Sequence, residues 1–181
     1  MRRLPQVARE VCATGHELGN HTDTHPRLCF ESPGFIYREL ARTQEAIEKV
    51  TSVRPTLFRA PSGLRWYGLR PAQRRLGLTG VMWTAIGYDW SRPAEQVIQI
   101  FLDQATSGAI FCLHDGRRTR TNPDISATVK APAAFVPMLL DRGFHFESVG
   151  RMMRRRDDSQ TRLETSSVSG RTENNEHPVS G

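Results

Sequence analysis

Short apolar runs alternate with helical patterns along residues 4–149, and this alternation limits the fold more than any other feature of the sequence. Apolar residues at helical spacing predict helices over residues 4–13, 35–50, 69–76, 93–105 and 131–142. Short runs suited to strands lie between and after them, at residues 17–20, 56–59, 80–86, 109–114 and 144–149. Strands separated by helices favour a mainly parallel sheet with helices on its faces. We therefore predict an α/β fold.

Four polar residues that could carry chemistry lie at the ends of predicted strands or shortly after them: His21, Arg59, Asp89 and His114. In folds of this class the ligand site forms at the carboxyl ends of the parallel strands. We therefore expect these four side chains to meet in one pocket, although they come from distant parts of the chain.

Two histidines, His21 and His25, are separated by three residues. Along a strand this spacing spans ~13 Å, which is too far for one metal ion. On a helical turn the two are neighbours, and both imidazoles can then reach one zinc ion. Pro26 disfavours helix at His25, so we predict a short helical turn that ends there. His21 and His25 are the candidate metal ligands.

Three further motifs follow. Residues 59–63, Arg-Ala-Pro-Ser-Gly, combine a strand-end arginine with a stiff proline and a permissive glycine, which suits a loop whose backbone approaches a ligand. Asp89 and Trp90 place a carboxylate beside a large apolar wall, and His114 ends an apolar strand. Taken singly, each residue also has an ordinary structural explanation: Arg59 as an ion-pair residue, Trp90 as core, His114 as a strand-end histidine.

In their order and kind, these motifs resemble those of the NodB-homology polysaccharide deacetylases, carbohydrate esterase family 4, over about residues 4–149. The resemblance implies a distorted (β/α) barrel with a mainly parallel sheet, incomplete in this chain. It also implies a metal-dependent hydrolase that removes N-acetyl groups from peptidoglycan-like or chitin-like polysaccharides. The implied cofactor is Zn²⁺ or another divalent metal bound by His21 and His25, and the implied place of action is the cell envelope or the outside of the cell.

The resemblance also implies a role for each remaining site residue. Arg59 positions the catalytic base, and Asp89 orients His114, which is the general acid. Trp90 lines the substrate pocket, and the backbone N–H of Ser62 or of a neighbour holds the oxyanion. His16, His145 and His177 lie outside the motifs and are interpreted as structural.

One motif of that family, Thr-Phe-Asp-Asp-Gly, is not found in the sequence. In the family it supplies the catalytic base and a third metal ligand, an aspartate. Three explanations stay open: a fragment, a misassigned start, or a truncated and inactive relative. Asp23 is a poor substitute, because on a helical turn it faces away from His21 and His25. We expect weak zinc binding and very slow deacetylation by this chain. A smaller departure is Cys112, where the family commonly has leucine.

Composition separates two regions, a deacetylase-like domain over residues 1–150 and a polar tail over residues 151–181 that we expect to be disordered. Lys and Arg number 25 against 19 Asp and Glu, but the basic residues are scattered, so no nucleic-acid partner is predicted. No apolar run approaches the ~20 residues of a membrane helix. No export signal is visible at the start.

Two alternatives to an N-deacetylase remain at this point. The same fold also hosts hydrolysis of other non-peptide C–N bonds, such as cyclic amides, and fold analogy does not separate these reactions. A chain without its base and third metal ligand could also be a non-catalytic module that binds carbohydrate or cell wall.

Overall fold

The computed structural model describes residues 4–116, 122–156 and 158. The chain divides into two compact units, Met1–Phe146 and Glu147–Gly181, and every labelled helix and strand belongs to the first. The helices of that unit are α1 (Pro5–Ala13), α2 (Pro33–Thr51), α3 (Leu69–Leu76), α4 (Ala94–Asp103) and α5 (Ser126–Asp141). The strands are β1 (Leu57–Phe58), β2 (Thr79–Gly80), β3 (Ala85–Ile86) and β4 (Phe111–Cys112).

The strands form two parallel pairs, which confirms the predicted alternation and strand direction. β1 pairs with β2, and β3 pairs with β4. Asn20 extends the first pair through a parallel bridge to Phe58, and it is the only residue of the predicted strand 17–20 that pairs. Within the described residues the two pairs do not join into one sheet, and no closed barrel forms.

The predicted strand 80–86 is divided into β2 and β3 because the chain changes its pairing partner there. The backbone N–H of Val81 donates to the carbonyl of Phe58, at 2.8 Å. Three residues later the N–H of Thr84 donates to the carbonyl of Ile110, at 3.0 Å. Residues 81–84 therefore carry the chain from the first strand pair to the second.

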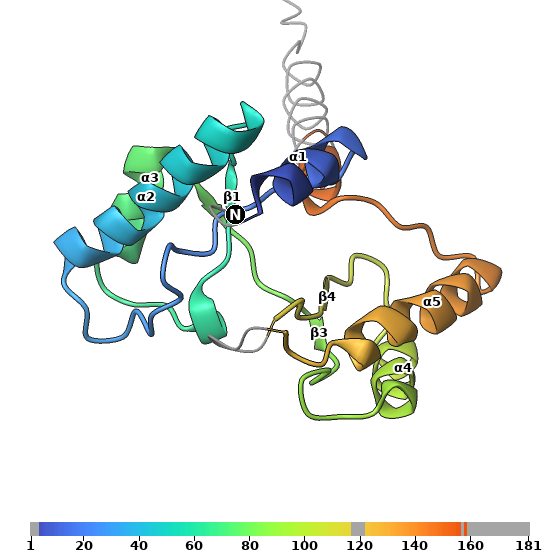
Figure 1. The fold of residues 1–181 in the computed structure, drawn as a ribbon. Coiled ribbons are helices and arrows are strands. Elements are labelled where there is room, and N and C mark those ends of the chain that lie inside the picture. Colours follow the sequence, from blue (N-terminus) through green and yellow to red (C-terminus); the bar gives the residue numbers. More distant parts are fainter. Residues whose placement is uncertain (1–3, 117–121, 157, 159–181) are drawn as a thin grey trace, which may run out of the picture. The chain divides into compact units, whose positions relative to one another are not determined.

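Each strand pair is packed against its own helices (Figure 1). In the first half of the unit, α2 and α3 bury a cluster that includes Leu28, Ile36, Leu40, Phe58 and Leu69. In the second half, α4 and α5 bury a cluster that includes Val97, Phe101, Ala131, Phe135 and Leu139.

α2 begins where a cap and a proline favour a helix start. The side-chain oxygen of Ser32 accepts the N–H of Phe35, at 3.2 Å, and Pro33 occupies the first turn. The helix then directs Ile36, Leu40 and other apolar residues of one face into the first cluster. The same helix also contacts the segment that carries the two candidate metal ligands.

Two predicted elements differ from the structure. α5 begins five residues before the predicted position 131, and it accommodates Pro132 and Pro137 in its interior. The predicted strand 144–149 is wrong, because among the described residues no strand pairs with it and residues 149–156 are helical instead. That helix includes residues 151–156 of the predicted tail, whereas residues 157 and 159–181 lie outside the described part of the chain.

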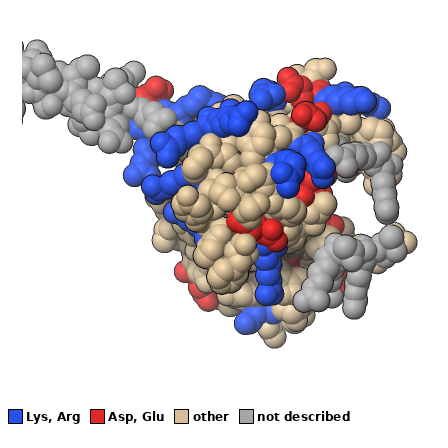
Figure 2. Space-filling model, turned by 90° about the vertical axis from the view of Figure 1, so that its left-hand side faces the viewer, with Lys and Arg blue, Asp and Glu red and all other residues tan. Residues whose placement is uncertain are grey.

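Charge and hydropathy of the described surface add two observations. Figure 2 shows Lys and Arg side chains together with Asp and Glu side chains on the same face. None of the helices in the described part of the chain has the length and apolar character needed to cross a membrane.

Candidate active site

The segment with His21 and His25 leaves the sheet directly after Asn20. It is not the predicted helical turn: Thr22 and His25 have left-handed backbone angles, with φ of 67° and 56°. The two imidazole rings nevertheless lie side by side, with their centroids 4.9 Å apart and their planes at 74°. The expected juxtaposition is present, but it is made by an irregular turn.

The orientation of His21 is set by the neighbouring strand end. Its Nδ1 lies 2.7 Å from the carbonyl oxygen of Arg59. Because a carbonyl only accepts, Nδ1 carries the proton and the lone pair of Nε2 is available to a ligand. A backbone carbonyl on the second ring nitrogen is a common support for a metal-binding histidine.

The environment of His21 also favours the neutral ring. Burial of part of the ring lowers the pKa of His21, the carbonyl of Arg59 raises it in part, and the charges of His25, Arg59 and His114 lower it. A neutral imidazole is the form that binds metal ions.

These two histidines fit a divalent metal ion: imidazole nitrogen is a suitable donor, and the Arg59 carbonyl orients the ring of His21. They supply two ligand positions. Zinc sites in enzymes normally use three protein ligands. Over residues 4–116, 122–156 and 158, no group of three His, Cys, Asp or Glu side chains could hold a metal ion. The two histidines therefore form only part of a complete ligand set within the described residues.

Asp89 and His114 form the second part of the site. Asp89 is 2% exposed, and its carboxylate accepts the ring Nδ1–H of His114 at 2.9 Å and the backbone N–H of His114 at 2.8 Å. The hydroxyl of Thr128, on α5, also lies within hydrogen-bond distance of this carboxylate. Burial alone would raise the pKa of Asp89, but the hydrogen bonds from Thr128 and His114 hold it below its usual value.

This pairing leaves Nε2 of His114 as the ring nitrogen that is not engaged by Asp89. Trp90 packs edge-on against the His114 ring, with a centroid distance of 4.5 Å and an interplanar angle of 82°. Tyr88 packs in turn against Trp90, at 5.3 Å. An aromatic wall therefore stands beside the histidine, with Trp90 and Tyr88 both partly exposed.

Arg59 connects the two halves. Its guanidinium donates to the carbonyls of Val81 and Met82, at 3.4 and 3.5 Å, and one nitrogen lies 3.9 Å from Sγ of Cys112 on β4. The same side chain lies over the ring of Trp83, at 5.9 Å. Arg59 thus reaches from the end of β1 to the second strand pair.

The loop after Arg59 has a tight backbone. Ser62 and Gly63 both have left-handed angles, with φ of 55° and 68°. A Cβ on Gly63 would lie 2.7 Å from the Trp83 ring, so only glycine fits there. Ser62 itself is exposed.

Three supporting residues were not predicted from the sequence: Asn20, Glu39 and Thr128. Asn20 and Glu39 are buried polar side chains that hydrogen-bond the His21–His25 turn, and Thr128 bonds Asp89. Glu39 and Thr128 lie outside the motifs, whereas Asn20 directly precedes His21 within one of them but had no role assigned. A polar residue on the apolar face of a predicted helix is the one signal that could have identified Glu39.

Comparison with known proteins identifies relatives of this chain. The sequence profile described as "Polysaccharide deacetylase" matches residues 1–81. A chitooligosaccharide deacetylase from Sinorhizobium fredii is 34% identical over 154 residues, which cover 80% of this chain and 71% of the relative. A peptidoglycan-N-acetylglucosamine deacetylase from Bacillus cereus is 30% identical, with 85% and 71% covered.

Solved structures show the same fold. A family 4 acetyl xylan esterase from Clostridium thermocellum, in complex with a cobalt ion, superposes with a TM-score of 0.75 at 26% identity. The match covers 85% of this chain and 72% of that one. Against an uncharacterised Bacillus subtilis protein of 30% identity, however, the chain spans only 46% of the relative's length.

Proposed function

Because the chain belongs to the polysaccharide deacetylase family, we propose that it is a metal-dependent hydrolase that removes N-acetyl groups from amino-sugar polymers. The observation that carries the proposal is the link that Arg59 makes between the two parts of the site. Its carbonyl bonds His21 of the His21–His25 turn, and its guanidinium lies beside Cys112, two residues before the His114 that pairs with the buried Asp89 and packs against Trp90. The chitooligosaccharide and peptidoglycan substrates of the relatives support the substrate class. We propose the cell envelope or the outside of the cell as the place of action, because peptidoglycan is a polymer of the envelope.

His21 and His25 would hold the metal ion, which we take to be Zn²⁺. A bound divalent metal supplies Lewis-acid polarisation of the acetyl carbonyl and a water of lowered pKa. The surroundings of His21 favour metal binding, because the Arg59 carbonyl fixes the tautomer of His21 and the lowered pKa of His21 keeps that ring neutral.

His114 is the proposed general acid. Its Nδ1–H is held by Asp89, so that a proton on Nε2 can be donated to the amine that leaves the sugar. The ionised Asp89 stabilises the imidazolium form, and Trp90 shields one side of the ring from water. Positioning of a proton donor in this way typically contributes ~10²–10⁴ in rate.

Arg59, Ser62 and Trp90 complete the proposed pocket. Arg59 presents its guanidinium between the two strand pairs, where it would position the base. Ser62 lies in the tight, exposed loop, and we assign its backbone N–H to the oxyanion. Trp90 offers an exposed ring edge to the sugar.

The base and the third metal ligand have no assigned residue among those described, so we propose slow turnover by residues 1–181. The test measures acetate released from N-acetylated chitohexaose with the protein in excess and Zn²⁺ present, together with zinc affinity by calorimetry. We expect acetate release above the protein-free rate, zinc binding that His21→Ala abolishes, and no effect of His145→Ala at an exposed position. Equal zinc affinity in His21→Ala would overturn the metal assignment.

Ester hydrolysis is a second candidate, favoured by the likeness to an acetyl xylan esterase. The same polarised carbonyl and the same acid would serve an O-acetyl group. Acetylated xylan, assayed beside chitohexaose, separates the two, since we expect faster release from the N-acetyl substrate. Saturable binding of chitohexaose with no acetate released from either substrate would support a non-catalytic carbohydrate-binding role instead.

A further inference from the structure

A buried carboxylate lies beneath the His21–His25 turn. Glu39 is in the middle of α2 and only 3% exposed. Its Oε2 accepts three hydrogen bonds, from the backbone N–H of Asp23 at 3.1 Å, the backbone N–H of Thr24 at 2.9 Å and the hydroxyl of Thr24 at 3.1 Å. A buried carboxylate is unfavourable unless such partners compensate it, and the turn supplies all three of these donors.

The turn requires an external support. Thr22 and His25 both have left-handed backbone angles, which are uncommon for residues other than glycine and particularly unfavourable for the β-branched Thr22. Strained conformations of this kind persist where the surrounding structure over-determines them. Glu39 bonds Asp23 and Thr24, the two residues between the strained positions.

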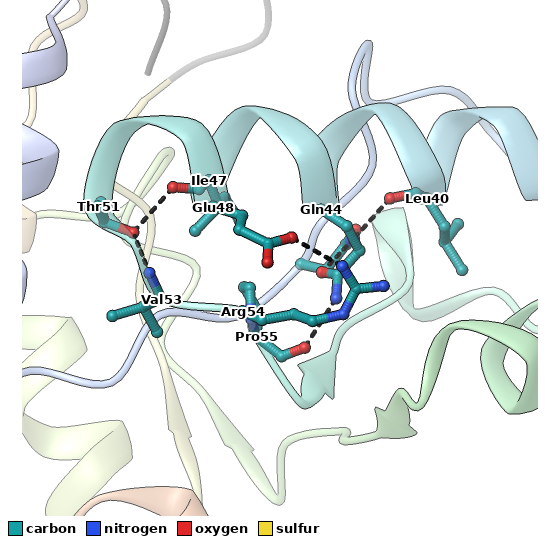
Figure 3. Close-up of polar contacts among 9 residues, drawn as sticks. Leu40, Gln44, Ile47, Glu48, Thr51, Val53, Arg54 and Pro55 are labelled. Carbon is teal, nitrogen blue, oxygen red and sulfur yellow. Dashed lines mark hydrogen bonds and ion pairs between the residues drawn. The ribbon is translucent and has the colours of Figure 1, made fainter.

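A second anchor holds the start of the turn to the same helix. The side chain of Asn20 donates to the carbonyl of Leu40 and to Oε1 of Gln44, at 2.9 and 3.0 Å, and its own oxygen accepts the N–H of Thr22. Gln44 donates in turn to the carbonyl of Pro55, at 2.8 Å (Figure 3). The helix therefore holds the turn at Asn20 as well as at Thr24.

From these contacts we propose that Glu39 is a positioning residue, which holds the His21–His25 turn in the shape that brings the two imidazoles together. The part of the proposal that concerns metal binding rests on the proposed function. The part that concerns the turn does not, because it follows from the hydrogen bonds and backbone angles alone. Glu39 would act through the turn and would not touch substrate or metal itself.

The main test replaces Glu39 by glutamine, which keeps the shape of the side chain but substitutes a weaker, neutral acceptor for the carboxylate. We expect hydrogen exchange at the Asp23 and Thr24 amides to accelerate at least about tenfold, with the circular dichroism spectrum unchanged. Zinc affinity of the folded protein should fall by about 10–100-fold, as for other outer-shell partners of metal ligands. Glu45→Gln is the matched control, an exposed glutamate on the same helix, and should change neither quantity.

A second variant tests the same contact from the turn. Thr24→Val removes one of the three donors without altering the buried core, and we expect a smaller acceleration of exchange, of about two- to fivefold. In the double variant the two effects should be less than additive, because Glu39→Gln weakens the same hydrogen bond that Thr24→Val removes. If Glu39→Gln fails to fold, exchange in the Thr24→Val single variant tests whether the contact between Thr24 and Glu39 holds the turn.

The outcomes separate the two proposals. Unchanged exchange at Thr24 in the folded Glu39→Gln variant would overturn the positioning role. A lowered melting temperature with exchange and zinc affinity of the folded protein unchanged would also overturn it, since Glu39 would then be merely structural. Zinc affinity that His21→Ala leaves intact, with faster exchange in Glu39→Gln, would overturn the metal assignment and leave the role of Glu39 in the turn supported.

Discussion

The two halves of the first unit hold their site residues by different means. In the half built from α2 and α3, the His21–His25 turn is tied down by buried polar side chains, Asn20 and Glu39. In the half built from α4 and α5, the core is a packed aromatic group that includes Phe101 and Phe135, and the carboxylate of Asp89 is held by Thr128 and His114. Among the described residues, four of the five buried polar ones belong to the first half: Asn20, Thr22, Glu39 and Gln44.

This difference reflects what each half must hold. The first half holds an irregular turn with backbone angles that side-chain packing cannot enforce, so directional hydrogen bonds are needed. The second half holds one ring, His114, whose orientation follows from two bonds to Asp89. We therefore expect the first half to be sensitive to polar replacements and the second to loss of core volume.

The largest expected effect is on the acid itself. Replacing His114 by alanine removes the proposed proton donor but leaves the His21–His25 turn untouched, so acetate release should fall by ~10²–10⁴ while zinc affinity stays the same. Single-turnover assays with excess protein measure the slow rates involved. His145→Ala, at an exposed position outside both halves' polar contacts, is the control and should behave as wild type. An unchanged rate in His114→Ala would remove this histidine from the mechanism.

The second largest expected effect is a loss of stability when core volume is removed from the second half. Phe135 is 2% exposed and contacts both Phe101 and Phe111, at centroid distances of 5.0 and 5.5 Å. Phe135→Ala should lower the free energy of unfolding by about 3–5 kcal/mol, because a cavity remains. Zinc affinity, measured well below the melting temperature, should be retained if the first half keeps its turn independently. Met138→Ala, at a 42% exposed position on the same helix, should cost much less.

The helices and the order of site residues could be predicted because both depend on residues that are close together in the sequence. The spacing of residues 69–76 and the stop at Gly77 correspond to α3 as observed, with Gly77 in a left-handed conformation. Asp89 and His114 follow recognisable strand ends, and the structure brings them together. The strands proved shorter than predicted, because pairing depends on the partner strand and changes between Val81 and Thr84.

The supporting residues could not be predicted, because their partners are far away in the sequence. Glu39 bonds residues 15 and 16 positions earlier, and Thr128 bonds an aspartate 39 positions earlier. The helical turn predicted for His21 and His25 was wrong for a related reason: Thr22 and His25 have left-handed angles, and the turn bonds residues of α2 that the spacing of the two histidines does not reveal.

A smaller effect is expected on the pH dependence of the free energy of unfolding. The pKa of Asp89 lies below its usual value in the folded protein, mainly through hydrogen bonds from Thr128 and His114 that outweigh the effect of burial. Its stabilising contribution is therefore complete above the pKa of an unfolded aspartate, ~3.9, and is lost as pH falls through the lower folded pKa. Asp89→Asn should lower the free energy of unfolding by about 1–3 kcal/mol at pH 7.

The difference in the free energy of unfolding between Asp89→Asn and wild type should narrow below about pH 4, because protonation makes the wild-type carboxyl group neutral, like the asparagine. Urea denaturation at a series of pH values measures it. Asp103→Asn is a suitable control, since that aspartate is exposed and accepts a hydrogen bond from Gln99 on its own helix. A difference that stayed constant from pH 7 to pH 3 would mean that Asp89 has the same pKa in the folded and the unfolded protein.

The smallest expected effect concerns the support behind Asp89. The Thr128 hydroxyl lies within hydrogen-bond distance of the Asp89 carboxylate and 2.8 Å from the carbonyl oxygen of His114, and its single proton serves one of them at a time. Thr128→Val removes this donor and keeps the shape, so stability should fall by about 1 kcal/mol. Because Thr128 is one of the causes that lower the pKa of Asp89, that pKa should rise, and the pH at which acid destabilises the protein should rise with it. In the first half, by contrast, Thr24→Val should leave the pKa of Asp89 unchanged, since Thr24 bonds Glu39 and not Asp89. An equal shift in both variants would show that the two halves do not hold their site residues independently.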